Sequence, residues 1–303
     1  MSLLAFPPRV RSRVHEHAPL APLTTWRIGG PAEFMVHAQT MCDVADTVAA
    51  CRSTGMALYV LGGGSNLLVG DEGVRGVVLT LHQMKGMKSY GNKVLVQAGA
   101  NLGSLVSRSS SAGIGGLQGL AGIPGTVGGA LAMNAGGRYA EIAQFVERVV
   151  WLNPHGELES RYREEIVFGY RTCSLRDGVV IEAVLSGPPG HPAELTAKAR
   201  EIMRAKLDSQ PYREFSAGCC FRNPMGQSAG RLIELAGCKG MAVGGAKVSE
   251  RHGNFIVNSG DARAEEVLEL MTQVAERVLG AHGVTLRPEV QIWPARAALA
   301  QAA

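Results

Sequence analysis

The chain of 303 residues is 46% hydrophobic and 18% charged, with a formal net charge of +4 at pH 7. These values are typical of a folded protein of two or three domains and exclude a disordered chain. Because no long run of lysine or arginine occurs and aromatic residues make up only 5%, we expect no nucleic-acid partner. No apolar run reaches spanning length and none follows the N-terminal arginines, so we expect neither a membrane segment nor a signal peptide.

The cysteines are spaced for neither a zinc site nor an iron–sulfur cluster, and no CxxC motif occurs. We therefore expect no metal, a reduced cytoplasmic protein, and cysteines that are mostly inert core residues. The six are Cys42, Cys51, Cys173, Cys219, Cys220 and Cys238.

Residues 1–20 contain prolines and arginines without clear periodicity and are predicted to be an N-terminal tail or an edge. The segment 21–82 then predicts a small βαβ unit. Its helix begins at Thr40, where Asp43 completes a capping box, and ends at Gly55. Strands are expected at 57–61 and 76–81.

The strand at 57–61 runs into a glycine-rich loop, residues 62–66, with the sequence GGGSN. Successive backbone N–H groups without a neighbouring Cβ can form a nest for phosphate, and Ser65 adds a hydroxyl group. The loop is neither a Walker A motif nor a GxGxxG fingerprint. Alone, it is weak evidence for a nucleotide.

The segment 83–207 predicts a second unit organised around the glycine-rich stretch 115–137. Apolar residues separate these glycines, whereas a flexible linker would carry polar ones, so we expect tightly packed backbone. Turns inside a core and a ligand held on buried amides both account for such a stretch. With the loop 62–66, it favours a dinucleotide whose pyrophosphate lies on one loop and whose ring system lies near the other. Around it we expect strands at 94–96, 146–152, 157–162 and 179–185, and helices at 101–112 and 192–207.

The segment 208–303 has a different character. Ser228 is expected to cap a short helix, and Asp261 a longer one in which apolar residues have helical spacing. Strands are predicted at 255–258 and 284–292, followed by an alanine-rich tail.

Three positions carry side chains suited to chemistry. Arg171 follows the residues FGY, Cys219 lies in SAGCCFRNP, and Glu289 lies in RPEV. Each also has an ordinary structural interpretation: a surface ion pair, a small buried hydrophobic residue and a solvated strand residue, respectively. Taken singly, the three residues favour these structural interpretations.

Taken together, the segments resemble one family, the UDP-N-acetylenolpyruvoylglucosamine reductases, which make UDP-N-acetylmuramate for peptidoglycan. The resemblance spans about residue 22 to residue 292 and keeps the order of the family's motifs. Single glycine motifs are weakly specific, but this ordered set is highly specific. The segments that carry it are TTWRIGGPAEF, LGGGSNLL, GLQGLAGIPGTVGGALAMNAG, FGYR, SAGCCFRNP, AGCKGMAVGGAKVS, FIVN and PEV.

The resemblance implies an α+β protein with an FAD-binding fold of the p-cresol methylhydroxylase type. Residues 21–82 and 83–207 would form its two FAD-binding lobes. Residues 208–303 would form an α+β substrate-binding domain whose last strand returns to the active site. NADPH would reduce non-covalently bound FAD, and flavin N5 would deliver hydride to the enolpyruvyl ether of UDP-N-acetylglucosamine in the cytoplasm. A monomer or weak oligomer is expected.

The resemblance also implies roles for individual residues. Arg171 and Glu289 would stabilise the enolate left by hydride transfer, and Cys219 would deliver the proton. Substrate-binding positions would be Tyr170, Lys206, Asn223, Lys239 and His252. FAD-binding positions would be Arg27, Gly62, Gly63, Gly64, Ser65, Asn66, Gly122, Ile123, Pro124, Gly125, Thr126, Gly128, Gly129, Asn134 and Ile181.

The chain departs from the family's pattern at three points. Cys219 stands where the family usually has serine; a thiol is a stronger acid but can ionise near neutral pH. Gln291 stands where the family often has arginine, and Arg287, on the same face of the predicted strand as Glu289, either supplies that cation or is a coincidence. The 48 positions from Arg171 to Cys219 leave no room for the tyrosine-bearing loop of the longer subclass, so the chain resembles the shorter one.

Two other functions compete with this one. An oxidase on the same FAD fold, acting on a sugar lactone or hydroxy acid, would share the glycine loops but has no need for FGYR, SAGCCFRNP and PEV together. A flavin or nucleotide-sugar sensor without catalysis is favoured only by the cysteine at the proton-donor position.

Overall fold

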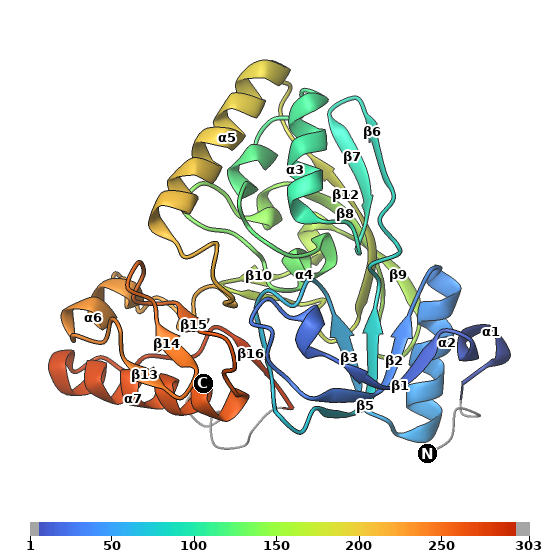
Figure 1. Cartoon of the computed structure of the whole chain (residues 1–303). Helices are drawn as coiled ribbons and strands as arrows, with labels where there is room; N and C mark the ends of the chain where they lie inside the picture. Colours follow the sequence, from blue (N-terminus) through green and yellow to red (C-terminus); the bar gives the residue numbers. More distant parts are fainter. Residues whose placement is uncertain (1–5, 295–303) are drawn as a thin grey trace. The chain divides into compact units, whose positions relative to one another are not determined.

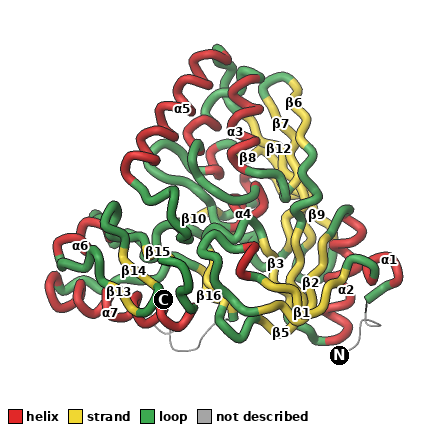
Figure 2. Tube along the Cα trace, viewed as in Figure 1, coloured by secondary structure: helices red, strands yellow, loops and turns green. Residues whose placement is uncertain are grey.

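The computed structural model describes residues 6–294, and the chain divides into two compact units, each with a hydrophobic core. Unit 1 comprises residues 6–16, Phe34–Gly63 and Gly76–Lys206. Unit 2 comprises His17–Glu33, Gly64–Arg75 and residues 207–294. Both units contain helices and strands, as expected for the predicted α+β class (Figure 2). The predicted alanine-rich tail lies outside the described residues.

The predicted βαβ unit is present. Its sheet has the strand order β1-β2-β5-β3, and β3 pairs with β5 in parallel. Of the two predictions for residues 1–20, the edge is confirmed for the described residues and the tail is wrong, because Phe6 and Val10 are buried in the core and β1 is an edge strand of this sheet. The elements are α1 (Pro8–Arg11), β1 (Val14–Pro19), β2 (Pro31–His37), α2 (Met41–Thr54), β3 (Leu58–Leu61) and β5 (Val74–Thr80).

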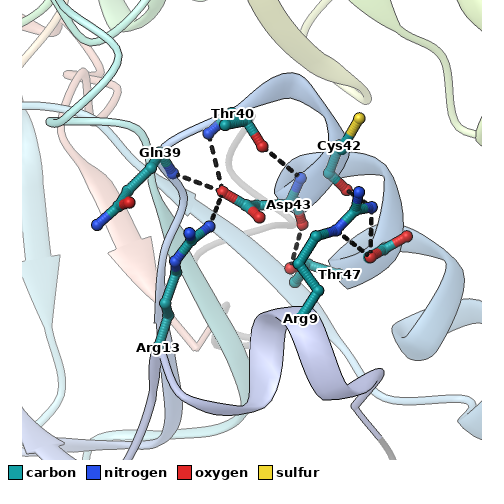
Figure 3. A network of polar contacts seen from close by, with 8 residues as sticks. Arg9, Arg13, Gln39, Thr40, Cys42, Asp43 and Thr47 are labelled. Carbon is teal, nitrogen blue, oxygen red and sulfur yellow. Dashed lines mark hydrogen bonds and ion pairs between the residues drawn. The ribbon is translucent and has the colours of Figure 1, made fainter.

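The start of α2 is fixed by the buried carboxylate of Asp43, as the capping box predicts (Figure 3). Asp43 Oδ2 accepts hydrogen bonds from the backbone N–H groups of Gln39 (2.9 Å) and Thr40 (2.8 Å) and pairs with the guanidinium of Arg13. Burial alone would raise the pKa of Asp43, but these hydrogen bonds and the charge of Arg13 outweigh it and lower the pKa. The network holds the segment before β1 against the start of α2.

We expect Asp43→Asn to cost about 2 kcal/mol of unfolding free energy at neutral pH, since it removes a buried charge that is paired with Arg13 and hydrogen-bonded through Oδ2. The pKa of Asp43 is lower in the folded state than in the unfolded state, where it is about 4. The stabilisation is therefore present above about pH 4 and is lost as the pH falls through the folded-state pKa. The difference in unfolding free energy between wild type and variant, measured by denaturant unfolding, should therefore be smaller in acid than at pH 7.

The matched control is Asp46→Asn, whose ion pair with Arg9 is more exposed and should contribute less than about 0.5 kcal/mol. An equal loss in both variants would contradict this account.

The second sheet of unit 1 is antiparallel, with the order β6-β7-β12-β8-β9, and it includes the predicted hairpin β8–β9. Helix α4 packs against β12 and β7 (Figure 1). Asn101 caps α3 as predicted, its Oδ1 accepting from Ser104 N–H. The elements are β6 (Met87–Tyr90), β7 (Lys93–Gln97), α3 (Leu102–Ser111), α4 (Val127–Ala132), β8 (Val146–Leu152), β9 (Leu158–Tyr162), β10 (Phe168–Gly169), β11 (Thr172–Cys173), β12 (Val179–Ser186) and α5 (Pro192–Ser209).

Unit 2 contains an antiparallel sheet, β13-β14-β15, with helix α7 packed against β13 and β14, and a parallel pair formed by β4 and β16. Ser228 caps α6 as predicted. The elements are β4 (Leu67–Val69), α6 (Ala229–Leu235), β13 (Ala242–Val243), β14 (Ala246–Val248), β15 (Ile256–Asn258), α7 (Ala264–His282) and β16 (Gln291–Trp293). Within residues 6–294, no helix combines the length and apolarity needed to span a bilayer.

Two predictions for unit 2 are wrong. Asp261 does not cap α7; instead Asp71, far away in sequence, accepts hydrogen bonds from the N–H groups of Ala264 (2.8 Å) and Glu265 (3.2 Å). The predicted strand at 284–292 is reduced to β16 and one bridge at Pro288, because residues 283–287 form no ladder.

Candidate functional site

The two predicted glycine loops pack directly on each other in unit 1. A Cβ added to Gly63 would lie 2.5 Å from Gly125 Cα, closer than real Cβ contacts permit. The carbonyl of Gly62 is bound by His82 Nε2 at 2.8 Å, an anchor that the sequence alone did not indicate. Glycine at position 63 is thus required by the contact between loops, whether or not a ligand is bound.

The second loop is anchored to the ends of the neighbouring strands. Gly122, Ile123, Pro124 and Gly125 connect a 3-10 turn to α4, and Thr126 caps α4 by accepting from Gly129 N–H (3.3 Å). The N–H of Gly128 donates to Ala98 O (2.8 Å), and a Cβ at Gly128 would lie 2.9 Å from Ala98 Cβ. The N–H of Ala98 in turn donates to the carbonyl of Ile181 (2.8 Å), which lies at a bulge in β12. The unit 1 residues predicted to bind FAD therefore gather around these two loops, with Asn134 the exception described below.

These loops fit a dinucleotide. Neither 62–66 nor 122–129 contains an acidic residue, so no carboxylate of these loops would repel an anionic ligand. The glycines that allow the loops to touch also leave backbone uncovered by side chains, as an approaching pyrophosphate requires. The residues present thus match the anionic part of FAD.

A tight turn presents Arg171. Strands β10 and β11 pair Gly169 with Thr172, so Tyr170 and Arg171 form a two-residue connection. Arg171 has φ +55°, and its guanidinium carbon lies 5.2 Å from the centre of the Tyr170 ring. Tyr170 is 46% exposed.

Lys206 is a second cation in this region. Its Nζ donates to the carbonyl of Ala121 (2.8 Å), beside the second glycine loop. Burial and then the charge of Arg171 lower the pKa of Lys206 to about 8. Two cations close enough to affect one another suit an anionic ligand group.

Asn134, also predicted to bind FAD, has its side chain hydrogen-bonded within unit 1. It is 3% exposed, and its amide nitrogen donates to Gly169 O (3.0 Å) and Glu141 Oε2 (3.1 Å). Its oxygen accepts from Ala143 N–H (3.3 Å). Both amide hydrogens are therefore used within unit 1.

In unit 2, the end of the first glycine loop meets the C-terminal segment. The N–H of Thr25 donates to Gly64 O (3.0 Å), and Ser65 and Asn66 follow. Asn66 Nδ2 donates to the carbonyl of Glu289 (3.3 Å), and Asn66 O accepts from Gln291 N–H (3.0 Å). Asn66, which is predicted to bind FAD, thus holds the backbone of Glu289, which is predicted to be catalytic. Arg27 is exposed and donates to Pro22 O (2.5 Å).

The segments around Cys219 and Glu289 pair with each other. Phe221 bridges Pro288, and the N–H of Glu289 donates to Cys220 O (2.8 Å). Asn254, which sequence reasoning missed, clamps Phe221 through its side chain, accepting from Phe221 N–H (2.9 Å) and donating to Phe221 O (2.7 Å).

Glu289 is 7% exposed, so its interpretation as a solvated strand residue is wrong. Arg287 is exposed and belongs to no strand, so the shared strand face that would let it replace a cation near Glu289 is absent.

The two adjacent cysteines differ in environment. Cys220 is 1% exposed, and burial, with smaller effects from Cys219 and Glu289, raises the pKa of its thiol to about 12. Cys219 is only half-buried, which removes its interpretation as a buried hydrophobic residue. Of the two thiols, Cys219 is therefore the one available for chemistry.

The remaining predicted substrate-binding residues surround α6. Asn223 Oδ1 accepts from Ala229 N–H (3.0 Å), and Lys239 Nζ pairs with Glu234 Oε1 (3.1 Å). His252 approaches the helix so closely that a Cβ on Gly230 would lie 2.9 Å from its Cε1. Burial and the charge of Lys239 lower the pKa of His252. In the described part of the chain, no group of three or more histidine, cysteine or acidic side chains is arranged to hold a metal.

Comparisons with known proteins agree with these observations. Two family models match: the UDP-N-acetylenolpyruvoylglucosamine reductase C-terminal domain over residues 210–293, and an FAD binding domain over residues 32–160. The reductase of that name from Bacillus licheniformis is 40% identical over 284 residues, covering 92% of this chain and 94% of its own length. The one from Carboxydothermus hydrogenoformans is 38% identical over 287 residues, covering 94% and 95%. The crystal structure of the reductase from Thermus caldophilus aligns with a TM-score of 0.81 at 41% identity, covering 93% of this chain and 99% of that one.

Proposed function

Because the chain belongs to the UDP-N-acetylenolpyruvoylglucosamine reductase family, we propose that it reduces the enolpyruvyl ether of UDP-N-acetylglucosamine to UDP-N-acetylmuramate for peptidoglycan synthesis. The chain is a flavoprotein of the p-cresol methylhydroxylase fold type, and FAD, when bound, supplies the hydride that originates from NADPH. From the resemblance, we assign the FAD-binding lobes to residues 21–82 and 83–207 and the substrate domain to the segment that begins at residue 208, although His17–Glu33 and Gly64–Arg75 belong to unit 2. The nucleotide-linked substrate and NADPH place the reaction in the cytoplasm.

The observation that carries the proposal is the pairing of the segments that contain Cys219 and Glu289, in which Cys219 is half-buried and Glu289 is buried. Hydride addition to the enolpyruvyl methylene leaves negative charge on the neighbouring carbon and its carboxylate. Arg171 binds this carboxylate as a fork, and Glu289 stabilises the enolate. Cys219 then protonates the carbon.

The UDP portion is assigned to α6 and its surroundings. Asn223 and Lys239 contact the diphosphate and sugar, and His252 lines the same region. Lys206 and Tyr170 lie with Arg171 and bind the anionic part of the substrate. These assignments follow the family resemblance and the grouping of the residues around one helix and one turn.

The competing functions have less support. A lactone or hydroxy-acid oxidase offers no reason for a buried Glu289 held by Asn66. A sensor without catalysis rests on the cysteine at the donor position, and a thiol that is partly accessible remains able to donate a proton.

We expect Cys219→Ser to remove the alkaline fall in the rate of flavin reoxidation by substrate, because a thiol ionises at alkaline pH and a serine hydroxyl does not. Cys219→Ala should accept hydride from NADPH at a normal rate and then stall. Anaerobic stopped-flow measurements across pH give both half-reactions separately. Cys220→Ala is the matched control and should keep the alkaline fall, because its thiol is buried and already protonated in this range. An unchanged pH profile in Cys219→Ser, with near-normal reoxidation in Cys219→Ala, would assign proton delivery to another group.

A further inference from the structure

The turn that carries Arg171 has little support of its own. Strands β10 and β11 contribute two residues each, and an isolated two-stranded hairpin is at best marginally stable. Arg171 also has φ +55°, a conformation that costs free energy in a residue with a Cβ. Contacts from outside the hairpin must therefore hold it in place.

Besides the packing of Phe168 and Cys173 in the core of unit 1, contacts from Arg163 and Asn134 reach the hairpin. The guanidinium carbon of Arg163 lies 5.0 Å from the centre of the Phe168 ring, which packs the start of the hairpin. Asn134 Nδ2 donates to the carbonyl of Gly169, the last residue before the turn, at 3.0 Å. The second contact is the closer of the two to Arg171 in the chain.

The orientation of the Asn134 amide is fixed from three sides. Glu141 Oε2 accepts from its nitrogen, and Ala143 N–H donates to its oxygen, so the nitrogen faces Gly169. The side chain is 3% exposed and its backbone has φ +41°, which asparagine tolerates better than most residues. A buried amide with every hydrogen used is costly to disturb.

We propose that Asn134 is a positioning residue that fixes the Tyr170–Arg171 turn through the Gly169 carbonyl and so sets the Arg171 guanidinium for the substrate carboxylate. This inference rests on the proposed function of Arg171. It gives Asn134 a role in the second half-reaction instead of in FAD binding.

The test uses Asn134→Gly, which removes the side chain but accepts the positive φ, and Asn134→Asp, which keeps the shape but loses the donors. In the FAD-loaded enzyme, we expect reduction by NADPH to stay within about three-fold of wild type. Reoxidation by substrate should slow by about ten-fold or more in both variants. The matched control is Asn153→Ala, another buried asparagine bonded to glutamates, which lies in the β8–β9 turn and should leave reoxidation unchanged.

The decisive measurement combines Asn134→Gly with Arg171→Ala. If Asn134 acts through Arg171, its loss should slow reoxidation by less than about three-fold in the Arg171→Ala background. An undiminished effect in that background, or loss of FAD with normal reoxidation in the remaining holoenzyme, would overturn the inference. If Arg171→Ala alone leaves reoxidation unchanged, the proposed role of Arg171 fails, and the role of Asn134 fails with it, while reoxidation by the substrate would still support the reductase function.

Discussion

Arg171→Ala should slow flavin reoxidation by the enolpyruvyl substrate by about two orders of magnitude or more, and Glu289→Ala should do the same. Both side chains are assigned to charge that develops only after hydride leaves the flavin, so their stabilisation is absent from the first half-reaction. Flavin reduction by NADPH should therefore remain within a few-fold of wild type. Anaerobic stopped-flow absorbance follows the two steps separately.

Two further variants sharpen this test. Arg176→Ala removes an exposed arginine close by in the chain and should leave both steps unchanged. Glu289→Gln keeps the shape and a hydrogen-bond donor, so a smaller loss than in Glu289→Ala would indicate that Glu289 acts as a protonated donor. Equal damage to both half-reactions in Arg171→Ala or Glu289→Ala would instead indicate a role in folding or in FAD binding.

Gly63→Ala should empty the FAD site. The new Cβ would lie 2.5 Å from Gly125 Cα, and because the obstacle is backbone it cannot rotate away. The two loops would have to separate, which displaces the backbone proposed to bind the cofactor. The purified variant should contain less than about a tenth of the wild-type FAD per chain, measured by the absorbance of the flavin released on denaturation.

Gly137→Ala is the matched control for this variant. Gly137 lies at the end of the same glycine-rich stretch, but a Cβ there meets nothing within 4 Å, so normal FAD content is expected. Full flavin content in Gly63→Ala would show that the contact between the loops is not needed for binding.

Much of the local structure follows from short-range patterns. The capping boxes and caps at Thr40, Asn101 and Ser228 were predictable because the partner groups are three residues away along the chain. The hairpin at 146–162 was predictable because the turn residues 153–156 separate two runs of strand length. The family's motifs also identified most of the candidate site residues.

Features that depend on distant partners were not predictable. Asp261 stands at the expected capping position for α7, but the carboxylate that serves the helix comes from Asp71. The segment 284–292 alternates like a strand, yet it pairs only where Phe221 and β4 offer partners. For the same reason, nothing local indicated that Asn66 holds Glu289, that Asn254 clamps Phe221, or that Asn134 bonds the hairpin of Arg171.

The most direct test of the account is an anaerobic titration of the yellow holoenzyme. NADPH should bleach the flavin, and UDP-N-acetylglucosamine enolpyruvate should then restore the colour with formation of UDP-N-acetylmuramate. If the substrate fails to restore the colour and oxygen does so after reduction by a sugar lactone or hydroxy acid, the chain is an oxidase. If NADPH does not bleach the flavin at all, the proposed reductase function is contradicted.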